Sequence, residues 1–181
     1  MTVATLLDLY VVDVCGTLVR DDTTLGLLRH HFARDGHRQI RYMLFRAVTA
    51  RCSPLRLAFA VLEKLTGRHL LKHAAVRLLA GDQVVALNHS ASEYAALLLA
   101  HRRITSVWPL LCAPMQAGRV VLASASLEPV VAALASTMGV RHVANALGQE
   151  AGILTGHYES DLTGGKEQAL IKKYGRDVMA G

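Results

Sequence analysis

The apolar positions of this chain form short continuous runs in some places and helically spaced stripes in others. Residues 6–14 are mostly apolar, with valines near the end of the run, and predict a buried parallel strand. Similar runs at 120–123 and 140–144 predict two further strands, and a glycine-flanked run at 152–156 predicts a short fourth strand.

The spacing is helical from about residue 25 to residue 103. Apolar residues recur there at intervals of three and four, as on one face of an α-helix. The clearest stripes are Ile40/Met43/Leu44/Ala47/Val48, Leu55/Ala58/Phe59/Leu62/Leu65 and Leu70/Leu71/Ala74/Ala75/Leu78/Leu79. Breaks at Ser53-Pro54, Thr66-Gly67 and Gly81-Asp82 divide this segment into roughly three to five helices.

The ends of the other helices carry their own signals. Polar residues 20–24 predict a helix start with side-chain caps, and Pro129 suits the first turn of a helix that ends near Gly139. A last helix opens at Lys166 and fades at Tyr174. This order predicts an α/β fold, a doubly wound parallel sheet with an inserted all-helical cap. We expect residues 1–23 and 114–181 to form the core and residues 24–113 to form the cap.

Positive charge is concentrated in the predicted cap. The chain of 181 residues carries a net charge of +6, yet residues 29–77 hold eleven Lys/Arg against Asp35 and Glu63, and five of the nine histidines. A basic lobe beside a catalytic site would attract an anionic substrate. For most of these residues, including the His69/His73 pair, a solvated helix face is the simpler interpretation.

Composition also bears on the compartment. No run reaches the roughly 18 apolar residues that span a bilayer, and residues 1–5 lack the basic leader of a signal peptide. Cys15, Cys52 and Cys112 are odd in number and far apart, which suggests neither a disulfide framework nor a zinc site. We expect a cytoplasmic protein without a transmembrane segment, for which peripheral membrane contact stays open.

Three polar side chains stand where phosphoryl chemistry would need them. Asp13 follows the first strand, Ser124 follows the strand at 120–123, and Lys166 opens the last helix. Ligands of open α/β sheets bind outside the carboxyl ends of the strands. Singly, the three could be a structural aspartate, a helix cap and a surface lysine. Together and in this order they resemble the motifs of a known family, and that resemblance implies a site for a tetrahedral anion.

The sequence Asp13-Val14-Cys15-Gly16-Thr17, with Ser124 and Lys166, resembles the motifs of the haloacid dehalogenase (HAD) superfamily. Residues 115–131, 152–156 and 161–166 resemble its phosphoserine-phosphatase-like branch in particular. The resemblance implies a Mg2+-dependent phosphate monoester hydrolase that forms an aspartyl-phosphate.

The resemblance also implies the role of each site residue. Asp13 would be the nucleophile, Cys15 would occupy the general acid position, and Lys166 would balance charge. Gly16, Thr17, Ser124, Ala125 and Lys166 would bind the phosphoryl group, while the Asp13 carboxylate and the Cys15 carbonyl would hold Mg2+. The substrate would be a phosphorylated small molecule or a lipid-linked phosphate, with the apolar, basic cap favouring the bulkier kind, and no nucleic acid is expected.

Two positions depart from the family's pattern. Cys15 replaces the aspartate that usually serves as general acid and base, and a lost general acid costs on the order of 10²–10⁴ in rate. The acidic fourth motif that binds Mg2+ would follow one more strand, whereas the sequence stops at Asp177–Gly181. We therefore expect a truncated or frameshifted member with an exposed sheet edge at the place of that strand.

Other functions remain open from the sequence. A catalytically weak or inactive pseudo-phosphatase would bind phosphate or a partner without turnover. A phosphonate-cleaving enzyme would use Lys64 or Lys72 as a Schiff base, and a basic nucleic-acid-binding module would centre on residues 29–77.

Overall fold

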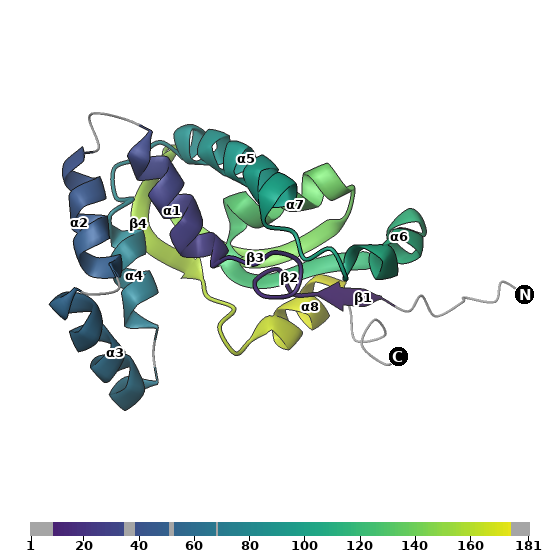
Figure 1. Ribbon diagram of the computed structural model, residues 1–181, viewed down its shortest axis with the longest axis horizontal. Helices are drawn as coiled ribbons and strands as arrows, with labels where there is room; N and C mark the ends of the chain where they lie inside the picture. The colour runs from purple at the N-terminus through teal and green to yellow at the C-terminus, as the bar shows by residue number, and fades with distance from the viewer. Residues whose placement is uncertain (1–8, 35–38, 51–52, 68, 175–181) are drawn as a thin grey trace, which may run out of the picture.

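A four-stranded sheet lies at the centre of the computed structural model, which describes residues 9–34, 39–50, 53–67 and 69–174 (Figure 1). The strands are β1 (Tyr10–Val12), β2 (Val120–Leu127), β3 (Arg141–Glu150) and β4 (Ile153–Ser160), in that spatial order. β1, β2 and β3 are parallel, and β4 runs antiparallel to β3. Within the described residues, β2 is the only neighbour of β1, so β1 is an edge strand.

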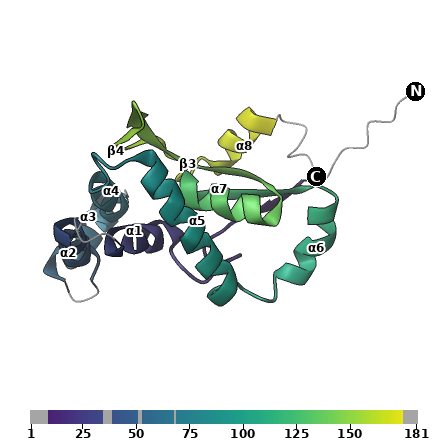
Figure 2. The same cartoon turned by 90° about the horizontal axis from the view of Figure 1, so that it is seen from above.

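Helices cover both faces of the sheet, as the prediction of a doubly wound α/β fold requires. α1 (Thr23–Ala33), α5 (Val84–His101) and α7 (Glu128–Met138) lie over one face, and α8 (Lys166–Tyr174) lies over the other (Figure 2). Alternate residues of β2 therefore enter different clusters: Leu122 joins the core under α7, whereas Val121 packs with Leu170 of α8. Because both faces are buried, the start of β2 is continuously apolar.

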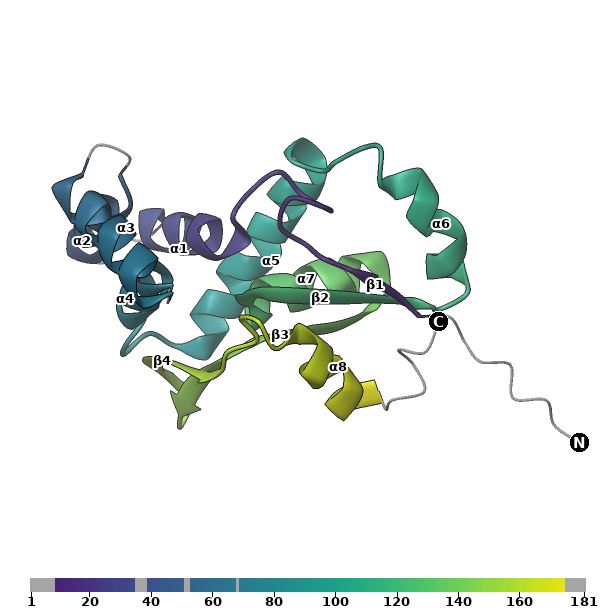
Figure 3. The same ribbon diagram turned by 90° about the horizontal axis from the view of Figure 1, so that it is seen from below.

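The remaining helices gather at the two ends of the molecule. α2 (Gln39–Thr49), α3 (Pro54–Thr66) and α4 (Leu70–Arg77) lie with α1 at one end, and α6 (Trp108–Gln116) lies at the other (Figure 3). α5 contacts α7 as well as α1. The division into a core and a cap at residues 24 and 113 therefore stays a prediction. None of the described helices is both long and apolar enough to cross a membrane.

The predicted helix ends are confirmed by the observed caps. The Asp22 carboxylate accepts hydrogen bonds from the backbone N–H groups of Thr24 and Leu25, at 3.1 Å each, and so caps α1. Pro129 lies in the first turn of α7. Gly139 ends that helix with a φ of 66°, a left-handed conformation that costs a glycine little.

The sheet differs from the prediction in two places. Residues 6–14 were expected to form a buried strand; residues 6–8 lie outside the described residues, and Tyr10 and Val11 are nearly half exposed because β1 is at the edge. The runs at 140–144 and 152–156 were expected as strands of a parallel sheet. The first run lies in β3, which is parallel to β2 as predicted but extends to Glu150. The second run lies in β4, which instead pairs antiparallel with β3 as a hairpin through Ala151 and Gly152.

Candidate active site

Asp13 and Lys166 are in direct contact although 153 positions separate them. The ammonium of Lys166 donates a hydrogen bond of 2.9 Å to a carboxylate oxygen of Asp13, and both side chains are partly open to solvent. Asp13 directly follows β1, and Lys166 is the first residue of α8. Val12 pairs with Leu122, so Asp13, which follows it, lies beside the middle of β2.

The loop after Asp13 is closed by its own backbone. The N–H groups of Leu18 and Val19 both donate to the carbonyl of Val14, at 3.0 Å each, and the N–H of Gly16 donates to Val19 at 2.9 Å. Gly16 has a φ of 78°, and no atom lies within 4 Å of the place where a side chain would begin. The loop therefore needs glycine for its backbone conformation and leaves open space beside it.

Behind Asp13, a thiol and three hydroxyls form a connected cluster. The Cys15 sulfur lies 3.1 Å from the Thr23 hydroxyl and 3.2 Å from the Ser126 hydroxyl. Thr23 donates to the Ser126 oxygen over 2.5 Å, and Ser124 donates to the same oxygen over 3.0 Å. The three hydroxyl-bearing residues are buried, so this network fixes the side chains beside the loop that follows Asp13.

Ser124 lies inside β2 rather than at its end. The strand was expected to finish there, but it continues to Leu127 in an irregular register with β3. Ser124 is 1% exposed, and its hydroxyl is already engaged by Ser126. Its predicted role as a phosphoryl ligand therefore stays a prediction.

The segment that leads to Lys166 is held by Asn145 of β3. Its side-chain amide donates to the Ala125 carbonyl at 2.9 Å and to an Asp161 oxygen at 3.1 Å, and its carbonyl oxygen accepts from the Leu162 N–H at 2.7 Å. The same Asp161 oxygen accepts from both the N–H and the hydroxyl of Thr163. These contacts fix the turn that places Lys166 beside Asp13.

Hydrogen bonding also sets the charge state of this turn. Burial by itself would raise the pKa of the Asp161 carboxyl, but the hydrogen bonds from Thr163 and Asn145 and the nearby His73 ring lower that pKa overall. The Asp161 carboxylate is therefore stabilised in its charged form. Burial, together with the charges of Asp161 and Asp22, raises the pKa of Tyr158, which keeps its phenol protonated.

α4 faces this turn across a small hollow lined by residues of both parts. The hollow is bounded by His69, Lys72, His73, Ala125, Asn145, Tyr158, Asp161 and Thr163. His73 stacks edge-on against Tyr158, with ring centroids 4.9 Å apart, and the ammonium of Lys72 lies 3.1 Å from an Asp22 oxygen. A Schiff base requires a neutral amine. Of the two candidate lysines, Lys72 is instead ion-paired with Asp22, and Lys64 is exposed on α3.

A larger cavity of about 480 Å³ adjoins this hollow. The two share His73 and Tyr158, and the larger one extends between α3, α4 and β4. Phe59 and Leu70 make one part of its wall apolar, while Arg77 and His157 add polar groups. This volume is in the range of small-molecule sites.

The donors available for a metal ion are few. Within the described residues, no three His, Cys, Asp or Glu side chains lie close enough together to hold a cation. Asp13 offers one carboxylate, of which one oxygen is bonded to Lys166. Mg2+ is usually bound through one or two protein carboxylates together with phosphate oxygens and water, so this donor set fits the lower end of that range.

The structure thus brings together some of the predicted site residues and adds others. Asp13 and Lys166 are in contact, Cys15 and Ser124 belong to one buried network, and Gly16 and Thr17 lie in the closed loop. The sequence reasoning missed Thr23, Ser126 and Asn145. Ser126 had a signal, because residues two apart in a strand point to the same face and Ser126 follows Ser124 at that spacing.

Solved structures with a similar fold include a HAD-family hydrolase and a phosphoserine phosphatase. The chain aligns with a Bordetella pertussis Tohama I protein of unknown function at a TM-score of 0.54 and 20% identity, over 84% of this chain and 66% of that one. It aligns with a HAD-family hydrolase of Salmonella enterica serovar Typhi at 0.52 and 10% identity, over 93% and 51% of the two chains. A phosphoserine phosphatase in apo form gives 0.52 and 16%, over 93% and 72%.

The chain has a HAD-like fold. At these identities the comparison establishes the fold of the phosphoserine-phosphatase-like kind, and the chain spans less than two thirds of the first two structures. No protein-family model matches the sequence, and no curated protein matches it significantly.

Proposed function

We propose that this HAD-like protein is a phosphate monoester hydrolase that uses Mg2+ and forms an aspartyl-phosphate. The observation that carries the proposal is the contact of Asp13 with Lys166 at the carboxyl end of the parallel strands. A carboxylate held by an ammonium in that place has the charge pattern that phosphoryl transfer needs, because the cation offsets the negative charge of the incoming phosphate.

The proposed reaction has two steps. A carboxylate oxygen of Asp13 attacks phosphorus, the bond between phosphorus and the ester oxygen breaks, and the released alkoxide takes a proton. Water then attacks the phosphorus of the acyl phosphate, which returns the Asp13 carboxylate and releases inorganic phosphate. Lys166 binds the phosphoryl oxygens together with N–H groups of the loop at Gly16 and Thr17 and, within β2, with the Ser124 hydroxyl and the Ala125 N–H.

Mg2+ would be held by the Asp13 carboxylate and the Cys15 carbonyl, and when bound it would neutralise phosphate charge and orient the phosphoryl group. Cys15 lies where a carboxylic acid would protonate the leaving oxygen. A thiol is the weaker proton donor, so we expect slow turnover.

The substrate class follows from the cavity beside the site. The hollow at Lys72 and Asp161 shares His73 and Tyr158 with the larger cavity, whose wall combines Phe59 and Leu70 with Arg77 and His157. We infer that the group attached to the phosphate points into this cavity. The proposed substrate is accordingly a phosphorylated small molecule. A lipid-linked phosphate is the alternative substrate, and the assay below includes one.

The second candidate function is a catalytically weak or inactive pseudo-phosphatase in the cytoplasm that binds a phosphorylated ligand. Cys15 in the acid position and the single carboxylate at the metal site favour it. It differs from the first candidate in turnover alone.

One assay separates the two candidates. Phosphate release by the purified chain is measured with Mg2+ on phosphorylated amino acids, nucleotides, sugars and a lipid phosphate, with Asp13→Asn as the control. Release that the control abolishes supports the hydrolase. Phosphate binding without release, at similar affinity in Asp13→Asn, supports the pseudo-phosphatase. Neither binding nor release would contradict both.

A further inference from the structure

Exposed apolar side chains are concentrated on two neighbouring helices, α2 and α3. Fourteen large apolar side chains are strongly exposed among the described residues, and eight of these lie between positions 40 and 65. They are Ile40, Met43, Leu44, Leu55, Leu57, Val61, Leu62 and Leu65, and we call them the α2–α3 patch. Concentrations of this kind mark surfaces that meet another apolar phase.

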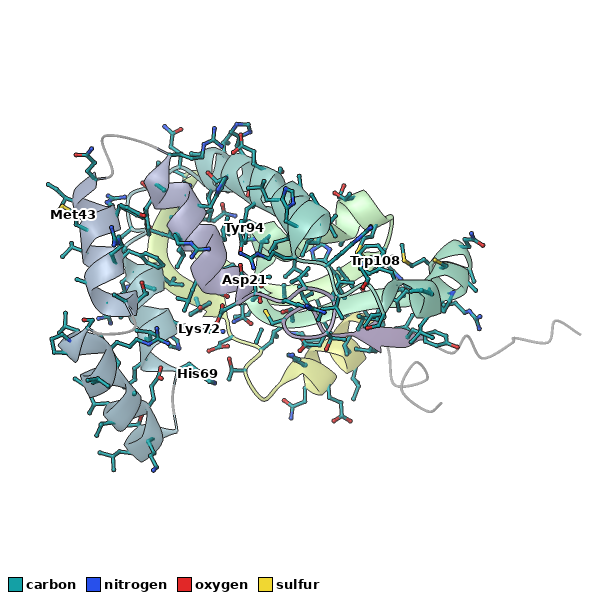
Figure 4. All side chains as sticks on the ribbon, in the orientation of Figure 1. Asp21, Met43, His69, Lys72, Tyr94 and Trp108 are labelled. Atoms are coloured by element: carbon teal, nitrogen blue, oxygen red, sulfur yellow. The ribbon has the colours of Figure 1, made fainter. Side chains whose placement is uncertain are left out.

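The helix α2 turns its most regular apolar stripe outward. Ile40, Met43 and Leu44 follow the spacing i, i+3, i+4, and Ile40 and Met43 are 74% and 70% exposed. The side chain that packs inward is Phe45, which meets Phe32 of α1 with ring centroids 5.9 Å apart. In Figure 4, Met43 points away from the rest of the molecule. The helix is therefore amphipathic, and its apolar stripe has no partner in the described part of the chain.

The helix α3 has no buried residue among those described. Leu57, Val61 and Leu65 lie at i, i+4 and i+8, so they share one side, and Leu65 is 77% exposed. The opposite side meets the protein through polar contacts: Arg56 donates to the Thr49 carbonyl at 2.9 Å, and Glu63 accepts from the Leu71 N–H at 2.9 Å.

The same segment carries the net charge of the whole chain. Residues 38–68 contain seven Lys/Arg and one Glu, a net charge of +6, and the rest of the sequence is balanced. Arg46 on α2 and Lys64 on α3 are exposed beside the apolar stripes. Two helices with an outward apolar side and flanking cations are typical of segments that lie in the interface of an anionic bilayer.

We propose that the α2–α3 patch binds the surface of membranes that contain anionic lipid. Charge complementarity decides between this occupant and a second copy of the chain. A two-fold dimer through the patch would bring the same surface of each copy together, and hence the exposed cations Arg46 and Lys64 of both copies. An anionic lipid surface attracts that charge, and its acyl region receives the exposed leucine, methionine, valine and isoleucine side chains.

The proposal does not depend on the proposed hydrolase activity. The patch consists of exposed residues that take no part in the network around Asp13. The binding mode is peripheral, because the residues that point outward occupy one side of each helix while the other side contacts the protein.

Vesicle co-sedimentation of the full chain tests the proposal. We expect binding to phosphatidylcholine vesicles that contain phosphatidylglycerol, much weaker binding to phosphatidylcholine alone, and release at high salt. The variant Arg46→Gln/Lys64→Gln should weaken binding by about fivefold for each cation removed. The matched control replaces exposed cations elsewhere, as Arg103→Gln/Lys172→Gln, and should bind nearly like the wild type.

A second variant tests the apolar contribution. Met43→Ser/Val61→Ser/Leu65→Ser should reduce vesicle binding by about tenfold or more. The control Val85→Ser/Leu97→Ser/Leu110→Ser removes equally exposed apolar side chains from α5 and α6 and should leave binding unchanged. Far-ultraviolet circular dichroism and thermal melting verify that each variant is folded.

Three results would overturn the proposal. One is wild-type protein that stays in the supernatant with anionic vesicles at low salt. Another is equal binding by the patch and control variants. The third is a concentration-dependent dimer, seen by sedimentation velocity, that the patch variant abolishes while no vesicle binding occurs.

Discussion

Cys15 is held in a ring of hydrogen-bonding groups with Thr23 and Ser126. Both hydroxyls lie within 3.2 Å of its sulfur, and both residues are buried. A carboxyl at this position could accept from the Ser126 hydroxyl, whose oxygen already accepts from Thr23 and Ser124. The surroundings of residue 15 therefore suit a carboxylic acid, even though the chain has a thiol there.

We predict that Cys15→Asp raises phosphatase turnover by about 10²–10⁴, the usual contribution of a general acid. The new carboxyl can accept from the Ser126 hydroxyl and donate to the leaving oxygen. Steady-state phosphate release at saturating substrate measures the effect. Cys112→Asp, at an exposed cysteine, is the control and should change nothing. A folded Cys15→Asp protein with unchanged turnover would contradict the proposed role of the position.

A second prediction at this scale concerns Asp161 and pH. The pKa of its carboxyl is lowered from the usual 3.8 in the folded protein, so the unfolded state binds the proton more readily. The stabilisation by the charged form is complete above pH 3.8 and disappears as pH falls through the lowered pKa. Urea unfolding of the wild type and Asp161→Asn should differ at pH 6 and converge in acid. For Glu167→Gln, on the exposed side of α8, we expect little difference at either pH.

Among the elements, α1 and α5 approach each other closely at Gly26. A methyl group on Gly26 would overlap the Tyr94 hydroxyl and lie 2.6 Å from the ring carbon Cζ. Tyr94 is buried, and its hydroxyl donates to Asp21 at 2.9 Å, just before α1 begins (Figure 4). The glycine therefore sets the distance between the two helices.

Gly26→Ala should lower the free energy of unfolding by about 1–3 kcal/mol through overpacking. Tyr94→Phe should lower it by about 1 kcal/mol because its hydrogen bond is lost. In the double variant the alanine has more room, so we expect a total below the sum of the two. Urea denaturation gives all three values. Gly165→Ala, where no atom lies within 4 Å, should be neutral, and a strictly additive cycle would contradict the close contact.

Local patterns predicted which elements form better than they predicted what surrounds each element. The caps at Asp22 and Pro129 and the strand at 120–123 follow from neighbouring residues alone, and the structure confirms them. Periodicity could not predict that the stripe at Ile40 and Met43 faces outward, because spacing identifies one side of a helix without saying what covers it. The hairpin of β3 and β4 depends on long-range pairing that apolar runs do not encode.

In the whole molecule, the residues of the candidate site and those of the basic, apolar end come from different segments of the sequence. Asp13 and Lys166 could be predicted as neighbours because they match a known motif order. The contact of Cys15 with Ser126 joins residues 111 positions apart and could not. Asn145, which holds the turn before Lys166, stands within a strand and carries no local signal of its role.

Calorimetric titration with inorganic phosphate tests most directly whether Asp13 and Lys166 together bind a tetrahedral anion. We expect the wild type to bind phosphate. Lys166→Met should bind it at least about tenfold more weakly, since a charge-assisted contact is lost. Lys172→Met, on the exposed side of the same helix, should match the wild type. Equal phosphate affinity in the wild type and Lys166→Met would contradict the account.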